Sequence, residues 1–170
     1  MRQIVLKSVI AGMLLSLGCA GAQAVEVGQA APAFSLPRQG GGSLSLADLK
    51  GKVVYLDFWA SWCGPCRQSF PWMNDLQSRF GHRGLRVVGI NVDNRKADAD
   101  GFLAQLPADF TVAFDVKGEA PGAYQVKGMP SSYLIGPDGR VIKVHSGFRA
   151  EDRKELEAAI EAALKTGGAQ

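Results

Sequence analysis

Hydrophobic residues recur along the chain with two different periods, which predict strands and helices in alternation. Val53–Trp59 is apolar on both of its alternating faces except at Asp57, which is typical of a central strand covered on both sides. Through residues 63–80 the apolar side chains recur every three or four positions, which predicts an amphipathic helix. A second apolar run, at residues 85–92, predicts another buried strand.

The remaining elements are predicted to be shorter. A glycine-rich tip at residues 39–42 separates two short strands, and Gly136-Pro137-Asp138-Gly139 is a strong turn signal between the last two strands. The predicted segments are strands at 34–36 and 43–46, a helix at 96–106, a strand at Thr111–Phe114, a helical turn at 119–124, strands at Ser131–Ile135 and 140–144, and a last helix from Ala150. This order predicts an α/β fold in which helices cover both faces of a mixed β-sheet.

The first 24 residues have the composition of an export signal rather than of a folded segment. Arg2 and Lys7 precede a largely apolar stretch at residues 8–17, and Ala22-Gln23-Ala24 has the small-x-small form that signal peptidase cleaves. We therefore expect a signal peptide at residues 1–24 and one domain at residues 25–170, located in the periplasm.

Two alternatives would keep the chain at a membrane. Cys19 follows Gly18 and could be a lipidated cysteine, although Ser16 stands where such signals usually have Leu. The uncharged stretch 8–25 could also remain as an anchor, although it is short for a membrane span. Membrane attachment is expected only in these two cases.

The charge balance gives no sign of a nucleic-acid partner. The chain of 170 residues has 19 basic and 16 acidic side chains, and loss of the leader removes Arg2 and Lys7 but no acidic residue. The mature chain is then close to neutral, and it contains no run of Lys or Arg and no basic-aromatic stripe.

Loss of the leader also leaves Cys63 and Cys66 as the only cysteines. A disulfide-braced scaffold usually has several widely spaced pairs, so one closely spaced pair indicates chemistry rather than bracing. Cys63 lies at the start of the predicted helix, where free amide groups and the helix dipole stabilise a thiolate. We therefore expect Cys63 to be the exposed nucleophile and Cys66 to be the more buried resolving thiol.

Other uses of the pair have less support. Zinc needs about four ligands, and the mature chain adds only His82 and His145, both distant in sequence. Covalent haem attachment needs His after the second cysteine, but position 67 is Arg. A structural bridge across so small a loop adds little stability. We expect no metal and no cofactor beyond the Cys63–Cys66 disulfide, and we expect both histidines at the surface without a role.

The cysteine segment and the frame around it resemble one superfamily. Residues 56–66, Leu-Asp-Phe-Trp-Ala-Ser-Trp-Cys-Gly-Pro-Cys, are similar to the active-site segment of thioredoxin. The leader, the opening at 27–34, residues 67–71 (Arg-Gln-Ser-Phe-Pro) and the segment inserted before Met129-Pro130 resemble its exported TlpA/ResA branch. The resemblance covers nearly all of residues 27–164. It implies a thioredoxin fold: a central mixed sheet flanked by helices, with an N-terminal hairpin and a central insertion.

The resemblance also implies roles for residues outside the cysteine pair. Pro130 takes the place of the cis-proline beside the disulfide, where the backbone pairs with substrate. Without the resemblance this bond would be as readily trans. Met129, which precedes it, is expected to modulate thiol acidity and substrate fit, and Trp62 is expected at the contact surface. Asp57 matches the buried acid of thioredoxin.

Asp57 is also supported by a physical argument. A carboxylate inside an apolar strand should have a raised pKa, because burial disfavours its charged form. Asp57 lies six residues before Cys63, which makes proton transfer with Cys66 a reasonable hypothesis. The alternative is a carboxylate satisfied by a nearby Lys or by water.

One position departs from the resemblance. ResA-like proteins carry a functional Glu after the second core strand, and Asn94 stands in that place here. Asp93 lies one residue earlier, where its side chain could face away from the site. The departure weakens the transfer of a haem-maturation role.

Together these features predict a monomeric thiol–disulfide oxidoreductase that acts on exported proteins. Gly-Pro between the cysteines is more similar to reducing thioredoxins than to strong oxidants, so we expect a reductase supplied by a membrane electron donor of the DsbD/CcdA type. The expected substrates are apocytochrome c, copper-site cysteines or oxidised exported proteins. Two alternatives stay open: a module that holds Cu(I) between thiolates, and a peroxiredoxin, although its Pro-x-x-x-Thr-x-x-Cys pattern is absent.

Overall fold

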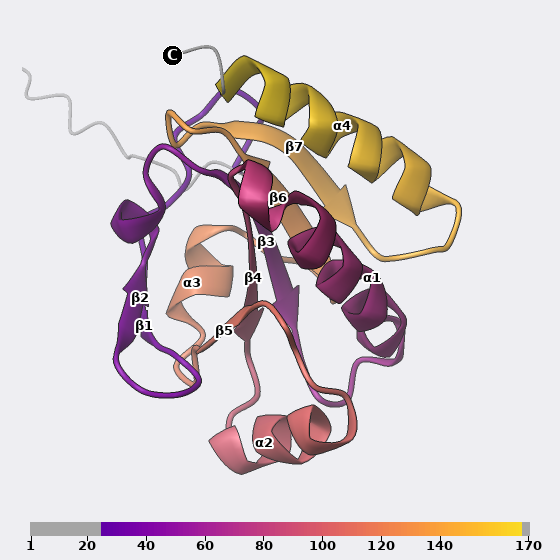
Figure 1. The fold of residues 1–170 in the computed structure, drawn as a ribbon. Coiled ribbons are helices and arrows are strands. Elements are labelled where there is room, and N and C mark those ends of the chain that lie inside the picture. Colours follow the sequence, from indigo (N-terminus) through magenta and orange to yellow (C-terminus); the bar gives the residue numbers. More distant parts are fainter. Residues whose placement is uncertain (1–24, 168–170) are drawn as a thin grey trace, which may run out of the picture.

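The computed structural model describes residues 25–167 (Figure 1). The predicted signal peptide at residues 1–24, including Cys19, lies outside the described residues. Among the helices of residues 25–167, none combines the length and the apolar character that crossing a membrane requires.

Five strands form the central sheet in the order β5-β4-β3-β6-β7. β3 (Val53–Trp59), β4 (Leu85–Asn91) and β5 (Thr111–Phe114) run parallel. β6 (Ser131–Ile135) runs antiparallel to β3, and β7 (Val141–Ser146) runs antiparallel to β6. The sheet is therefore mixed, as predicted, and its centre is the strand that carries Asp57.

Helices and a small hairpin cover the two faces of the sheet (Figure 1). The helices are α1 (Gly64–Phe80), α2 (Lys96–Gln105), α3 (Glu119–Ala123) and α4 (Asp152–Gly167), with 3-10 turns at Leu46–Leu49 and Gly81–Arg83. The hairpin pairs β1 (Ser35–Pro37) with β2 (Ser43–Ser45). α1 and α4 lie on one face, and α3 and the hairpin lie on the other. Between β4 and β6, where a central insertion was expected, the chain forms α2, β5 and α3.

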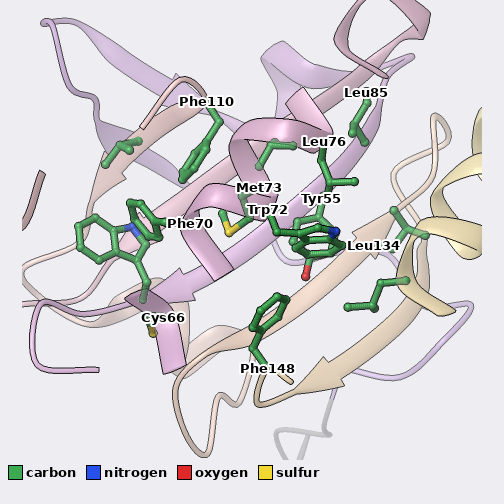
Figure 2. Close-up of a cluster of buried hydrophobic side chains, with 14 of the residues drawn as sticks. Tyr55, Cys66, Phe70, Trp72, Met73, Leu76, Leu85, Phe110, Leu134 and Phe148 are labelled. Atoms are coloured by element: carbon green, nitrogen blue, oxygen red, sulfur yellow. The ribbon is translucent and has the colours of Figure 1, made fainter. Parts of the chain in front are cut away.

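The two faces of β3 enter two separate hydrophobic clusters, which explains why the strand is almost continuously apolar. On one face Tyr55 and Trp59 pack with α1, α2 and α4, and part of this cluster is drawn in Figure 2. On the other face Leu56 and Phe58 pack with α3 and the hairpin. Asp57 shares the face of Tyr55 and Trp59, because alternate side chains along a strand point the same way.

The strand directions bring several loops to one end of the sheet. β3, β4, β5 and β7 finish there and β6 begins there, since antiparallel neighbours run in opposite directions. The turn at residues 136–139 lies at the other end. The N-terminal segment pairs with this far end: the Gly28 amide donates to the Val141 carbonyl at 2.7 Å, and the Ala31 amide donates to the Gly139 carbonyl at 2.9 Å.

Candidate active site

The cysteine pair forms a disulfide in the first turn of α1, where the chain leaves the central strand. Cys63 is the N-cap residue, and its Sγ accepts a hydrogen bond from the Cys66 amide at 3.2 Å. Pro65 lies in this first turn, where its missing N–H removes no helical hydrogen bond. A thiolate at Cys63 would face the same free amide groups and the positive end of the helix dipole.

Exposure separates Trp62 from the two cysteines. The Trp62 side chain is 72% exposed, whereas Cys63 is 4% exposed and Cys66 is fully buried. The prediction that Cys63 is exposed is therefore wrong for the disulfide form, because the bond to Cys66 holds Cys63 within the cluster packed on α1. The expected difference in exposure between the two cysteines is found, since Cys63 is more accessible than Cys66.

A buried carboxylate holds the loop that precedes Cys63. Asp93 accepts hydrogen bonds from the Ser61 amide at 2.9 Å and from the Ser61 hydroxyl at 3.0 Å. It also accepts from the Asn91 side-chain amide at 2.8 Å. Asp93 therefore faces the site rather than away from it, and it ties the end of β4 to the loop of the nucleophile. Asn94 is exposed.

The Met129-Pro130 peptide bond is cis, as the resemblance implied. Pro130 is buried, and Met129 is partly buried against both hydrophobic clusters. The Pro130 carbonyl accepts a hydrogen bond from the Gly147 amide at 2.8 Å. This bond joins the loop before β6 to the loop after β7, at the end of the sheet where the disulfide lies.

Asp57 lies in the interior without a partner for one of its oxygens. The residue is 2% exposed, and Oδ2 has no hydrogen bond among the described residues. Burial raises the pKa of Asp57 well above its usual range, because water no longer stabilises the charged form. The alternative in which a Lys satisfies the carboxylate is not found within residues 25–167.

The neighbouring strand explains why no cation approaches Asp57 from β4. The residue opposite Asp57 on that strand is Gly89. A Cβ atom at Gly89 would lie 2.9 Å from a ring carbon of Phe110 and 3.0 Å from Nε1 of Trp59. The two aromatic side chains fill this space, so β4 presents only backbone beside the carboxylate.

His145 was expected at the surface without a role, and its position differs from that expectation. It lies on the same face of the sheet as Asp57, its side chain is 22% exposed, and Nε2 is 3.3 Å from Asp152 Oδ2. The available sequence signal was its alternation with Ile142 and Val144, which are exposed on the opposite face. The other histidine, His82, is exposed as expected.

The fold and the site together define a class of protein. A CxxC disulfide at the start of the helix after the central strand, with a cis-proline loop at the same end of the sheet, is the arrangement of thioredoxin-fold thiol–disulfide oxidoreductases. Within residues 25–167, no group of three or more His, Cys, Asp or Glu side chains could hold a metal ion.

The chain belongs to the AhpC/TSA family, whose family model matches residues 27–144. Thiol-disulfide oxidoreductase ResA of Bacillus subtilis is 35% identical over 151 residues, covering 82% of this chain and 84% of that protein. A Chlorobium tepidum structure assigned as thiol:disulfide interchange protein DsbE is 55% identical with a TM-score of 0.81, covering 83% of this chain and 99% of that one. The thioredoxin domain of a Bacteroides vulgatus thiol-disulfide oxidoreductase is 25% identical with a TM-score of 0.73. The match covers 81% of this chain and 99% of that domain.

These similarities confirm the predicted fold and enzyme class. The relatives and the solved structures are named for thiol–disulfide exchange, and this chain has the disulfide that such exchange requires. The protein is a thiol–disulfide oxidoreductase with a thioredoxin fold.

Proposed function

We propose that this oxidoreductase works in the reducing direction on disulfides of proteins exported to the periplasm. One observation carries the proposal: Cys63 caps a helix beside the exposed Trp62, while the unpartnered Asp57 lies on the sheet face that the same helix covers. The Gly64-Pro65 dipeptide, which is similar to that of reducing thioredoxins, supports the direction.

The reaction starts from the reduced pair. The Cys63 thiolate attacks one sulfur of the substrate disulfide, forms a mixed disulfide and releases the first substrate thiolate. Cys66 then gives its proton to the Asp57 carboxylate, and the Cys66 thiolate attacks the Cys63 sulfur. The Cys63–Cys66 disulfide forms, the second substrate thiolate leaves, and two electrons have passed to the substrate.

Asp57 suits the role of proton acceptor because of its surroundings. Burial raises the pKa of Asp57, and a carboxylate with a raised pKa is a stronger base than an exposed one, which favours proton transfer from a thiol. Its place on the face covered by α1 puts it on the side of the sheet where Cys66 is buried. We therefore assign Asp57 to Cys66 rather than to Cys63, which is the more accessible of the two cysteines.

We assign substrate contact to Trp62, Met129 and Pro130. A large aromatic side chain that is 72% exposed beside a reactive group is suited to packing against a partner chain. The Pro130 carbonyl is already bound by Gly147, so a substrate strand is expected to pair with the backbone of Met129.

Location and partners rest on the leader and on the direction of electron flow. The pattern of residues 1–24 supports export to the periplasm, where disulfides persist and a reductase has to be supplied with electrons. We propose a membrane donor of the DsbD/CcdA type, and apocytochrome c, copper-site cysteines or other oxidised exported proteins as substrates. We expect the protein to act as a monomer and to bind no nucleic acid.

The equilibrium potential of the Cys63/Cys66 couple against glutathione tests the direction. A value near that of thioredoxin, about −270 mV, supports a reductase, and a value near that of DsbA, about −120 mV, overturns it. Cys66→Ala then identifies partners in cells, because it leaves the mixed disulfide at Cys63 unresolved. Cys63→Ala is the matched control, since it lacks the attacking thiol.

The same preparation separates the two alternative activities. The peroxiredoxin alternative predicts that the reduced protein consumes a hydroperoxide faster than it reduces insulin. The metallochaperone alternative predicts tight Cu(I) binding by the reduced pair and no insulin reduction. Rapid insulin reduction with neither of these properties supports the oxidoreductase that we propose.

A further inference from the structure

Polar side chains form a row across the sheet face that carries Asp57. Asp57 on β3 lies directly opposite Ser132 on β6, and Ser132 lies directly opposite His145 on β7. Residues opposite one another in antiparallel strands point to the same face, with Cβ atoms about 5 Å apart. The row therefore runs from the centre of the sheet to its β7 edge, and Leu156 and Ile160 of α4 lie against it.

Tyr55 adds a second hydroxyl group to the row. Its hydroxyl donates a hydrogen bond to Ser132 Oγ at 2.9 Å, and both residues are buried. The pKa of Tyr55 is raised by burial and further by the carboxylates of Asp57 and Asp152, so the hydroxyl lies within electrostatic reach of both. Because Ser132 accepts from Tyr55, the proton of the Ser132 hydroxyl is free for another acceptor.

The outer end of the row is partly exposed to solvent, although His145 Nε2 itself is buried. His145 and Asp152 have side chains that are 22% and 24% exposed, and the 3.3 Å contact between them lacks hydrogen-bond geometry. Three buried side-chain atoms within residues 25–167 have no hydrogen-bond partner: Asp57 Oδ2, His145 Nε2 and Trp59 Nε1. Buried polar atoms are almost always satisfied, so unsatisfied atoms at both ends of one row point to a function for the row.

We propose that Ser132, Tyr55 and His145 relay protons between Asp57 and solvent during thiol–disulfide exchange. The inference rests on the proposed function, in which Asp57 takes the proton of Cys66. Protonated Asp57 cannot accept the proton of Cys66, so it first passes its own proton to the paired hydroxyl groups, and the imidazole of His145 takes one from them and releases it to water. Asp57 returns to the carboxylate, one proton has left the protein, and reduction of the disulfide runs the relay in reverse.

The surroundings of the row favour this path over others. From β4, Asp57 faces Gly89, which carries no side chain. The charged groups around His145 are Asp152 and Glu155 of α4 and Lys143 of its own strand. Lys143 is paired with Glu155 at 2.6 Å, which leaves Asp152 as the carboxylate beside the imidazole. Hydroxyl groups suit the interior of a relay because each can accept one proton while it donates another.

The test compares His145→Gln with His82→Gln, which removes an exposed histidine outside the row. Reduced protein is mixed with oxidised glutathione, and the decay of the mixed disulfide is followed by rapid quenching at several pH values. Loss of a proton acceptor is expected to slow this decay about tenfold at neutral pH in His145→Gln. The deficit should shrink at alkaline pH or when imidazole is added, and His82→Gln should match the wild type.

The Asp57→Asn background separates the relay from other roles. With no carboxyl proton to move, His145→Gln should add no further slowing there, and Ser132→Ala should behave in the same way. Equal slowing by His145→Gln with and without Asp57, or no rescue by imidazole, overturns the relay. A slow Asp57→Asn combined with a normal His145→Gln overturns the relay alone. A wild-type rate in Asp57→Asn at every pH instead overturns the proposed role of Asp57.

Discussion

Two buried carboxylates lie near the disulfide, and they differ in what surrounds them. Asp93 is 3% exposed and accepts hydrogen bonds from Ser61 and Asn91, while Asp57 is 2% exposed and has an oxygen without a partner. A buried carboxylate that accepts hydrogen bonds holds a loop in place, because its removal would leave the donor groups without a partner in the interior. Burial without donors raises the proton affinity of the group and leaves it available for chemistry. Burial alone therefore does not identify the functional acid.

The largest expected difference between the two carboxylates is in rate. Asp57→Asn should slow resolution of the mixed disulfide about a hundredfold at neutral pH, since it removes the general base for Cys66. Asp93→Asn should slow it much less, because Asp93 positions the loop and takes no proton. Single-turnover kinetics on both variants measure this difference. Equal rates for the two variants would contradict it.

The second difference is in stability, and it has the opposite order. Asp93→Ala should lower the free energy of unfolding by about 2 kcal/mol, because the Ser61 and Asn91 donors lose their acceptor in the interior. Asp57→Asn should leave the stability unchanged or raise it at neutral pH, since it removes an unpartnered buried charge. Urea unfolding of both variants measures these changes. Strong destabilisation by Asp57→Asn would contradict this, because it would mean that the carboxylate makes a stabilising interaction in the folded protein.

The third difference is in the pH dependence of stability. Because the pKa of Asp57 is raised in the folded state, the folded chain binds more protons than the unfolded chain above the usual Asp value of about 4. The stabilising contribution is complete below that value and is lost as the pH rises through the folded pKa. Asp57→Asn should remove a slope of up to about 1.4 kcal/mol per pH unit. Unfolding curves at several pH values measure this slope. Identical slopes for the wild type and Asp57→Asn would contradict a raised pKa at Asp57.

The smallest effect is expected at an exposed carboxylate, which serves as the reference for the other two. Asp100 pairs with Lys96 at 2.6 Å, and about half of each side chain is exposed. Asp100→Asn should change the free energy of unfolding by less than about 0.5 kcal/mol, because water and salt screen such pairs. A change as large as that of Asp93→Ala would show that burial is not what separates these sites.

The sequence was sufficient for the elements whose pattern is local. Val53–Trp59 and Ser131–Ile135 have their predicted bounds. The first is apolar on both faces except at Asp57, and the second ends at the turn signal Gly136-Pro137-Asp138-Gly139. The last helix, expected to begin near Ala150, starts at Asp152. The preceding loop is held by the bond from Gly147 to Pro130, a tertiary contact that local propensity does not contain.

From the sequence, the site was predictable in the identity of its single residues but not in how their side chains are arranged. Cys63, Cys66 and Asp57 follow from spacing and from an acid in an apolar strand, but the neighbours of Asp57 depend on strand register. A register irregularity between Leu134 and Ile135 helps to set which residue of β7 faces Ser132. A slip of one residue would turn His145 to the other face of the sheet, so the row could not be read from the sequence.

The pairing of the N-terminal segment with the start of β7 determines how the enzyme would be presented if the leader were kept or Cys19 carried a lipid. Gly28 and Ala31 are bound at the end of the sheet opposite the disulfide. A tether entering there would hold the far end of the domain toward the bilayer, with Trp62 directed outward by about 20 Å, the length of a strand of six residues. The domain would then have a fixed orientation, with its disulfide at the end that points away from the membrane attachment.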